Sequence, residues 1–172
     1  MDLTNNAVIK NIKVVNAEIS GHYKAGVIVG DGLCAQIDNC HVENAIVKIT
    51  TLNDNEANHA GGIVGYLSAE TVAYVTNSSV KNAEIYAFRD VAGIAGCANG
   101  ASVVTGNTVE NVTVVADQTP VYKNNNGENE EKDGNAAAIA GRVHANATIE
   151  PNTIGANVVV IRKVDSTKEF EA

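Results

Sequence analysis

Acidic side chains gather in two stretches of the sequence that could bind a cation or support carboxylate chemistry. The residues concerned are Asp54, Glu56, Glu128, Glu130, Glu131 and Asp133. Calcium sites need several convergent oxygen ligands, and glycoside hydrolysis needs a pair of carboxylates. The spacing matches no calcium-loop pattern, and "NNNGENEEKDGN" has the polar composition of a solvated loop. We therefore expect solvated loops here, with weak cation binding and carboxylate catalysis as the alternatives.

The other residue types that support chemistry lack the spacing that their chemistry needs. The four histidines contain no H-x-x-x-H pair, and the sequence has no G-x-S-x-G elbow, P-loop or G-x-G-x-x-G. His22 and His59 each precede a glycine-rich stretch, and we expect them in exposed loops. Cys34, Cys40 and Cys97 have no C-x-x-C spacing, so we expect buried free thiols. The sequence thus predicts no catalytic residue, no cofactor and no resident metal.

A glycine-rich block recurs along the chain and indicates a repeat protein. Its four copies read AGVIVG, AGGIVG, VAGIAG and AAAIAG, and they end at Gly30, Gly65, Gly96 and Gly141. A strand-like element with an apolar pattern follows each block, as in "VENAIV", "VKNAEI" and "VENVTV". An Asn column lies within this element, at Asn16, Asn44, Asn82 and Asn111. Stacked Asn side chains can bond one another and satisfy turn backbone groups, so we expect a solenoid corner there.

These repeats predict an all-β fold, a right-handed parallel β-helix of four to five rungs with three short strands each. The expected rungs cover about residues 8–24, 25–59, 60–90, 91–135 and 136–160. They form one repeat domain over 1–164, followed by a charged tail at 165–172. Such rungs cannot bury their own apolar faces, so neighbours must cover them. The alternative is an antiparallel β-sandwich, which explains the recurrence poorly.

Aligning the blocks on their last glycine gives a prediction for the core. The large residue that never changes is Ile28, Ile63, Ile94 and Ile139. Strand alternation then turns the small residues two places earlier inward as well. The remaining columns would point outward although they carry no polar side chain. We expect that apolar face to be covered by loops or to contact another domain or copy.

The unit "AGVIVGDGLCAQIDNCHVENAIV" resembles the GLUG-motif repeats, and "IDNCHVENAIV" is its closest part. The resemblance covers roughly residues 8–160. It implies a right-handed parallel β-helix on secreted or surface proteins of bacteria, including adhesins and non-catalytic regions of IgA-cleaving metallopeptidases. It implies no catalytic residue on the repeat itself. The expected location is extracellular or on the bacterial cell surface, with any signal sequence outside this chain.

Composition narrows the range of partners. The net charge is −8, which disfavours binding to nucleic acid and to anionic membranes. No apolar run reaches the length of a membrane span. We expect a structural or adhesive module that contacts other domains of a longer chain, a second copy, or a host protein or glycan. The alternative is a fragment of a β-helical polysaccharide lyase or glycoside hydrolase, although seven scattered Tyr and Phe residues offer few rings for sugar stacking.

Overall fold

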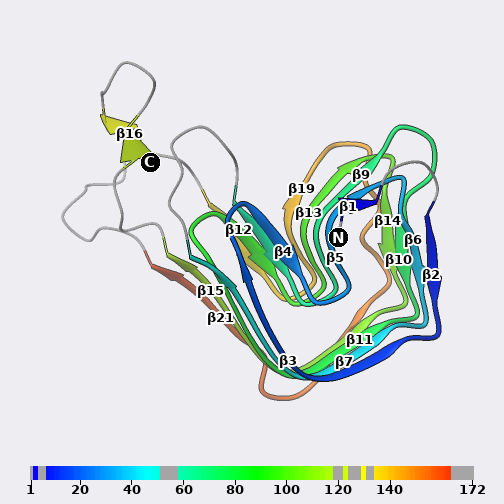
Figure 1. Cartoon of the computed structure of the whole chain (residues 1–172), viewed down its shortest axis with the longest axis horizontal. Coiled ribbons are helices and arrows are strands. Elements are labelled where there is room, and N and C mark those ends of the chain that lie inside the picture. The colour runs from blue at the N-terminus through cyan, green and yellow to red at the C-terminus, as the bar shows by residue number, and fades with distance from the viewer. Residues whose placement is uncertain are drawn as a thin grey trace.

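The computed structural model describes residues 2–3, 7–50, 58–117, 122–123, 129–130 and 134–163. Four parallel sheets, here named A to D, run side by side through the molecule (Figure 1). Sheet A contains β1 (Asp2–Leu3), β5 (Val29–Leu33), β9 (Val64–Ala69), β13 (Ala95–Gly100) and β19 (Ala140–Val143). Sheet B contains β2 (Val8–Lys10), β6 (Gln36–Asp38), β10 (Tyr74–Thr76) and β14 (Val103–Thr105).

Sheets C and D complete each turn of the chain. Sheet C contains β3 (Lys13–Gly21), β7 (His41–Ile49), β11 (Ser79–Ala87), β15 (Thr108–Asp117), β20 (Thr153–Ile154) and β21 (Val159–Lys163). Sheet D contains β4 (Lys24–Gly26), β8 (His59–Gly61), β12 (Asp90–Ala92) and β18 (Ala136–Ala137). One antiparallel pair, β16 (Tyr122–Lys123) with β17 (Asn129–Glu130), lies apart from the four sheets. Among the described residues no helix is long and apolar enough to cross a membrane.

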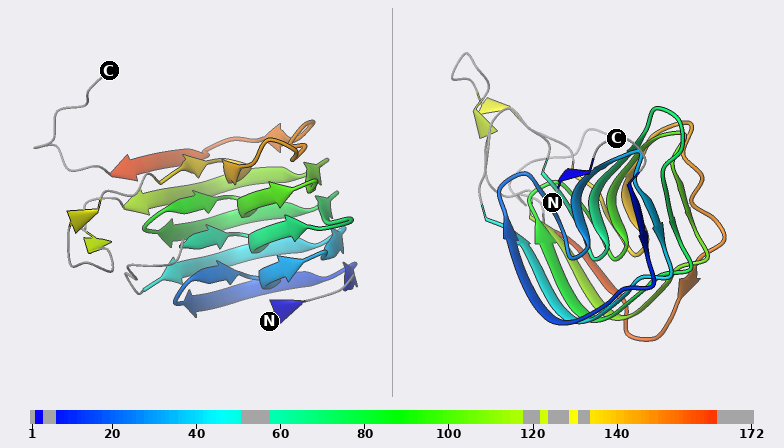
Figure 2. Two further views of the ribbon diagram at one scale, coloured as in Figure 1. Left: turned by 90° about the horizontal axis from the view of Figure 1, so that it is seen from above. Right: turned by 45° about the vertical axis from the view of Figure 1, so that its right-hand side comes forward.

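Each strand of the four sheets pairs in parallel with the equivalent strand of the next turn. In sheet C, for example, Val47 is in register with Ile85, and Ile85 with Val114. Viewed from the N-terminal end, the chain turns clockwise as it recedes, which is a right-handed coil (Figures 1 and 2). The predicted parallel β-solenoid is therefore confirmed, and the antiparallel sandwich is wrong.

The glycine block forms two strands, so a complete turn holds four strands in place of the expected three. In the second block, β8 ends at Gly61 and β9 begins at Val64, with the chain reversing at Gly62 and Ile63. Sheets D and A therefore form a narrow wedge that points into the molecule (Figure 1). Ile63 at the tip of the wedge is completely buried.

The two sides of the wedge lie backbone against backbone. A Cβ on Gly65 would lie 2.6 Å from the amide nitrogen of Ala25 and 2.6 Å from the carbonyl oxygen of Gly30. No real Cβ tolerates such distances, so sheet A must carry glycine where it faces sheet D. Gly65 is thus a residue of strand β9 that faces sheet D.

The apolar columns expected on an outer face belong to the core. Ala60 and Val64 are completely buried, as are Val91 and Ala95 in the next turn. The expectation assumed one straight strand, in which alternate residues point to opposite sides. Because the chain reverses at the wedge tip, both of its sides turn apolar residues into the core of the molecule.

Candidate functional site

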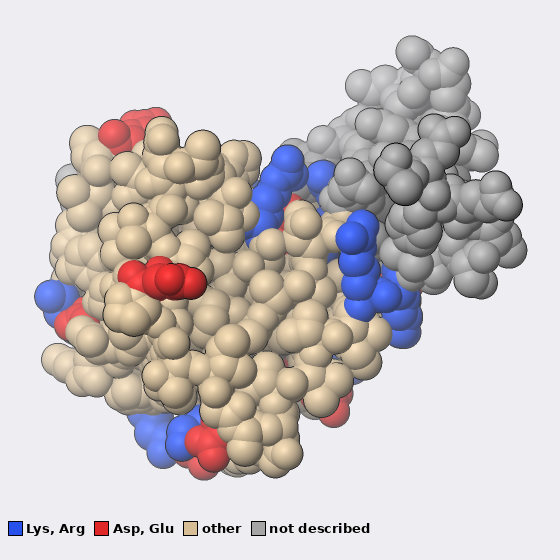
Figure 3. All heavy atoms as spheres, turned by 180° about the vertical axis from the view of Figure 1, so that it is seen from behind, with Lys and Arg blue, Asp and Glu red and all other residues tan. Residues whose placement is uncertain are grey.

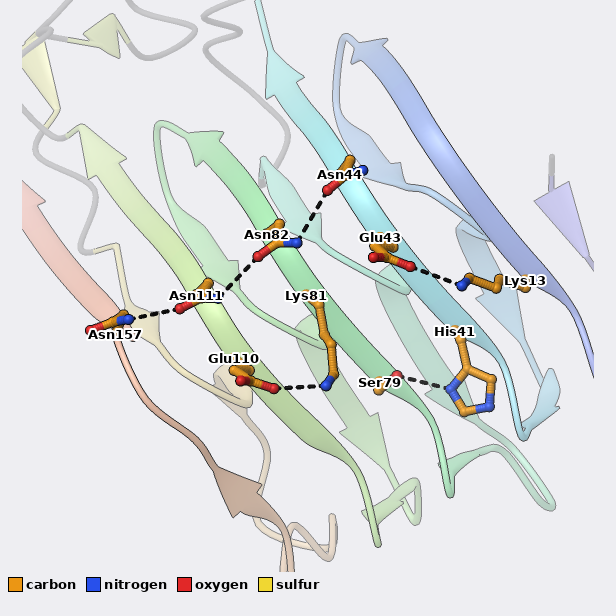
Figure 4. A network of polar contacts seen from close by, with 10 residues as sticks. All are labelled: Lys13, His41, Glu43, Asn44, Ser79, Lys81, Asn82, Glu110, Asn111 and Asn157. Carbon is orange, nitrogen blue, oxygen red and sulfur yellow. Dashed lines mark hydrogen bonds and ion pairs between the residues drawn. The ribbon is translucent and has the colours of Figure 1, made fainter.

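An asparagine ladder crosses the outer face of sheet C. Asn44 donates a hydrogen bond from Nδ2 to Oδ1 of Asn16 at 3.1 Å, and Asn82 does the same to Asn44 at 3.2 Å. Asn111 donates to Asn82 at 3.0 Å, and Asn157 to Asn111 at 2.9 Å (Figure 4). All five have φ between 51° and 58°, a left-handed conformation that Asn tolerates. The ladder therefore marks a bend within the long strands of sheet C, not a corner between strands.

Charged and polar pairs run beside the ladder on the same face. Lys13 Nζ lies 2.8 Å from Glu43 Oε2, and Lys81 Nζ lies 2.7 Å from Glu110 Oε2 (Figure 4). The hydrogen bond and charge of Lys13 hold the pKa of Glu43 below its usual range, and Glu110 raises the pKa of Lys81 in the same way. Glu43 is therefore charged near neutral pH, which makes it a poor general acid, and the carboxylate of Glu110 is likewise paired with a lysine.

A shallow groove of about 380 Å³ follows the other side of the ladder. Its walls are Asn44, Ala45, Ile46, Asn82, Ala83, Glu84, Asn111 and Thr113. The groove offers amide donors and acceptors at each rung, with aliphatic surface between them. Rungs lie about 4.8 Å apart, so a ligand lying along the groove meets the same groups repeatedly.

A second set of polar side chains fills the mouth of the wedge, which is the open end between sheets D and A. The residue directly before each glycine block is Lys24, His59, Asp90 or Asn135, and the residue directly after it is Asp31, Tyr66, Cys97 or Arg142. We call these two sets the flanking columns. They meet across the wedge, because Lys24 Nζ lies 2.6 Å from Asp31 Oδ2 and 4.4 Å from the centre of the Tyr66 ring. In the view from behind, Lys and Arg side chains lie close together at the upper right of the described surface (Figure 3).

Asp90 is the most buried charge of the flanking columns. Its Oδ2 lies 3.1 Å from His59 Nδ1, without the alignment of a good hydrogen bond, and 3.8 Å from a guanidinium nitrogen of Arg142. Asn135 donates to its Oδ1 at 2.8 Å. Burial alone would raise the pKa of Asp90, but His59 and Asn135 outweigh it and hold that pKa below its usual range.

The wedge mouth has no activated nucleophile in the described part of the chain. Cys97 is the closest candidate by chemistry, but burial raises its pKa to about 12, so the thiol stays protonated near neutral pH. Arg142, its neighbour in the column, and His59 both lie beside Asp90 instead. The flanking columns therefore hold the two sides of the wedge together.

Most of the carboxylates that sequence analysis singled out lie outside the described residues. This applies to Asp54, Glu56, Glu128, Glu131 and Asp133, whereas Glu130 belongs to β17. Residues 2–3, 7–50, 58–117, 122–123, 129–130 and 134–163 contain no group of three His, Cys, Asp or Glu residues arranged for a metal. His59, expected in an exposed loop, is 3% exposed because it begins strand β8 in the wedge.

The flanking columns were not predicted, although the sequence carries a signal for them. Each of these residues adjoins a glycine block, so reading one place outward on either side would have collected them. Their types vary between repeats, which hid them from a search for identical residues. The recurring strand element predicted the ladder at four Asn residues. It did not predict the fifth, Asn157, because Ala156 is an insertion before it.

No family model matches the chain, and neither a curated protein nor a solved structure matches it.

Proposed function

We propose that this chain is a non-catalytic repeat module of a bacterial surface or secreted protein, related to the GLUG-motif repeats, and that it contacts a glycan or a host protein. The outer face of sheet C is its contact surface. The quoted repeat units support the family, and the regular rungs suit a spacer that presents one face over its whole length.

The observation that carries this proposal is the asparagine ladder with its groove. The ladder places one carboxamide on each rung, and the groove adds Thr113, Glu84 and the half-buried Ile46. Carboxamides can donate and accept hydrogen bonds, as the hydroxyls of a glycan or the backbone of a peptide require. The acids Glu43 and Glu110 are held by lysines, which favours binding over catalysis on this face.

The test is binding of the purified chain to a glycan array and to a panel of host extracellular proteins. The variant Thr113→Lys places a long charged side chain in the groove and should weaken binding at least about tenfold, which corresponds to about 1.4 kcal/mol. Thr105→Lys is the matched control, since Thr105 is also half-buried on a strand of the same turn but lies in sheet B. It should bind like the parent.

A polysaccharide-cleavage screen runs beside the array. Turnover by the parent chain would contradict the non-catalytic assignment and favour the carbohydrate-active enzyme. Absence of binding to every glycan and protein tested would contradict the adhesive role. Equal weakening by Thr113→Lys and Thr105→Lys would contradict the assignment of the groove.

A further inference from the structure

We infer that the two ends of the solenoid are complementary and that copies of this chain associate head to tail. One end carries strand β3, which pairs on one side with β7. The other end carries β21, which pairs on one side with β15. In the described part of the chain no other strand pairs with β3 or β21. Each end therefore presents a row of backbone donors and acceptors to a parallel neighbour.

The asparagine ladder gives the two ends opposite hydrogen-bonding character. Every Asn donates from Nδ2 to the Asn of the preceding turn. At the N-terminal end, Asn16 accepts a bond but its Nδ2 has no partner among the described residues. At the C-terminal end, Asn157 donates but its Oδ1 has no partner within the same residues. A second copy placed head to tail would let Asn16 donate to Asn157, which continues the ladder in the same direction.

The apolar columns end in the same way. Val47, Ile85 and Val114 occupy one column and are at most 1% exposed. The same column ends at Ile19, which is half-buried, and at Val160, which is 43% exposed. A second column runs through Val42, Val80 and Val109 and ends at Ile154, which is 60% exposed. At each end of the stack, apolar side chains that the next turn covers elsewhere in the column are therefore exposed.

The register across the contact follows from the registers inside the molecule. Val160 occupies the column of Ile19, and Asn157 that of Asn16, so β21 of one copy would lie beside β3 of the next. Exposed apolar side chains gather at both ends, at Val8, Ile12, Val15, Val143, Ile154, Val159, Val160 and Ile161. A head-to-tail contact does not close on itself, so it forms rods of increasing length. This inference is independent of any ligand on sheet C.

The test measures association of the full chain by sedimentation velocity over a concentration series. The mass of the parent should rise from 17.9 kDa with concentration. Ile12→Lys blocks the N-terminal end at a residue that is 40% exposed, and Val160→Lys blocks the C-terminal end. Each variant alone should lose the concentration-dependent increase in mass. Val72→Lys is the matched control, because Val72 is 50% exposed in the middle of the stack, and this variant should associate like the parent.

Mixing the two blocked variants distinguishes head-to-tail contact from other arrangements. Each variant retains one free end, and the free ends are opposite, so an equimolar mixture should form a dimer and stop there. A parent that stays monomeric at every concentration would overturn the inference, as would a mixture that forms no dimer. Association of either blocked variant with itself would indicate a contact between like ends or between faces. Far-UV circular dichroism and the melting temperature check that each variant keeps the parent fold.

Discussion

Gly96 in sheet A lies so close to Ala60 in sheet D that a Cβ on Gly96 would be 2.7 Å from the amide nitrogen of Ala60. It would also lie 2.5 Å from the carbonyl oxygen of Gly65. Because both contacts are with backbone, no rotamer change can relieve them. We predict that Gly96→Ala lowers the free energy of unfolding by about 3 kcal/mol or more, measured by urea denaturation.

Gly30 provides the control within the same column. A Cβ there would have the carbonyl oxygen of Lys24 as its nearest neighbour, at 3.1 Å. Gly30→Ala should therefore destabilise the protein by much less, about 1 kcal/mol. Equal losses for Gly30→Ala and Gly96→Ala would contradict the view that backbone contact across the wedge selects glycine.

Asn82 contributes to stability in two ways, through its ladder hydrogen bonds and through its tolerance of left-handed backbone, and substitutions can separate them. This residue has φ 51° and makes ladder bonds with Asn44 and Asn111. Asn82→Ala loses the bonds and places an alanine in left-handed backbone, which costs about 1–2 kcal/mol on its own. Asn82→Gly loses the bonds but accepts the backbone, so its unfolding free energy should fall less. If urea denaturation gave the same loss for both, the backbone conformation would not be the reason for Asn.

Asp90 should make the stability of the folded protein depend on pH in the acidic range. Its pKa is below the usual value in the folded protein, so the charged form contributes stability above about pH 4, the range of an unfolded Asp. That contribution disappears as pH falls through the folded pKa. We predict that Asp90→Asn lowers the melting temperature at neutral pH and that its difference from the parent shrinks in acid.

Other carboxylates titrate in the same direction, so the difference between variant and parent is the quantity to follow. Asp38, whose pKa is lowered by hydrogen bonds from Thr76 and Asn77, keeps titrating in both proteins and cancels. A melting-temperature difference that stays constant from neutral to acidic pH would contradict the role assigned to the Asp90 charge.

The free thiols should react at different rates in the folded protein. Hydrogen bonds from the backbone N–H groups of Thr71 and Glu70 lower the pKa of Cys34, whereas burial raises that of Cys97 to about 12. Alkylation at mildly alkaline pH should therefore modify Cys34 before Cys97, as peptide mass spectrometry would show. Urea should abolish the difference. Equal rates in the folded protein would count against this order.

Repetition made the solenoid predictable, but the path within each turn was not. The recurring block gave the stacking direction and the parallel pairing, because equivalent residues lie in register from turn to turn. The reversal at Gly62 and Ile63 left no signal, since its residues look like the rest of a buried strand. Strand alternation therefore predicted an outer face for Val64 and Ala60, although both are buried in the core.

The flanking columns show the same limit of sequence-based prediction for the candidate site. A charge such as Asp90 is read from sequence as exposed, because buried charges are rare. Here the wedge brings His59 to it from the preceding turn of the chain, and Asn135 and Arg142 from the following turn. Contacts of this kind depend on the fold, so they could not be predicted before the wedge was known.

The connection from sheet C to sheet D is the place where the turns differ most in length. Two residues, His22 and Tyr23, join β3 to β4, whereas residues 118–135 lie between β15 and β18. The pairing beside this connection stays regular, with Ala25 beside Ala60 and Val91 beside Ala136. A foreign peptide grafted between Ala87 and Asp90 should therefore leave the stack intact, so the same corner can serve as a display position for engineered binding loops.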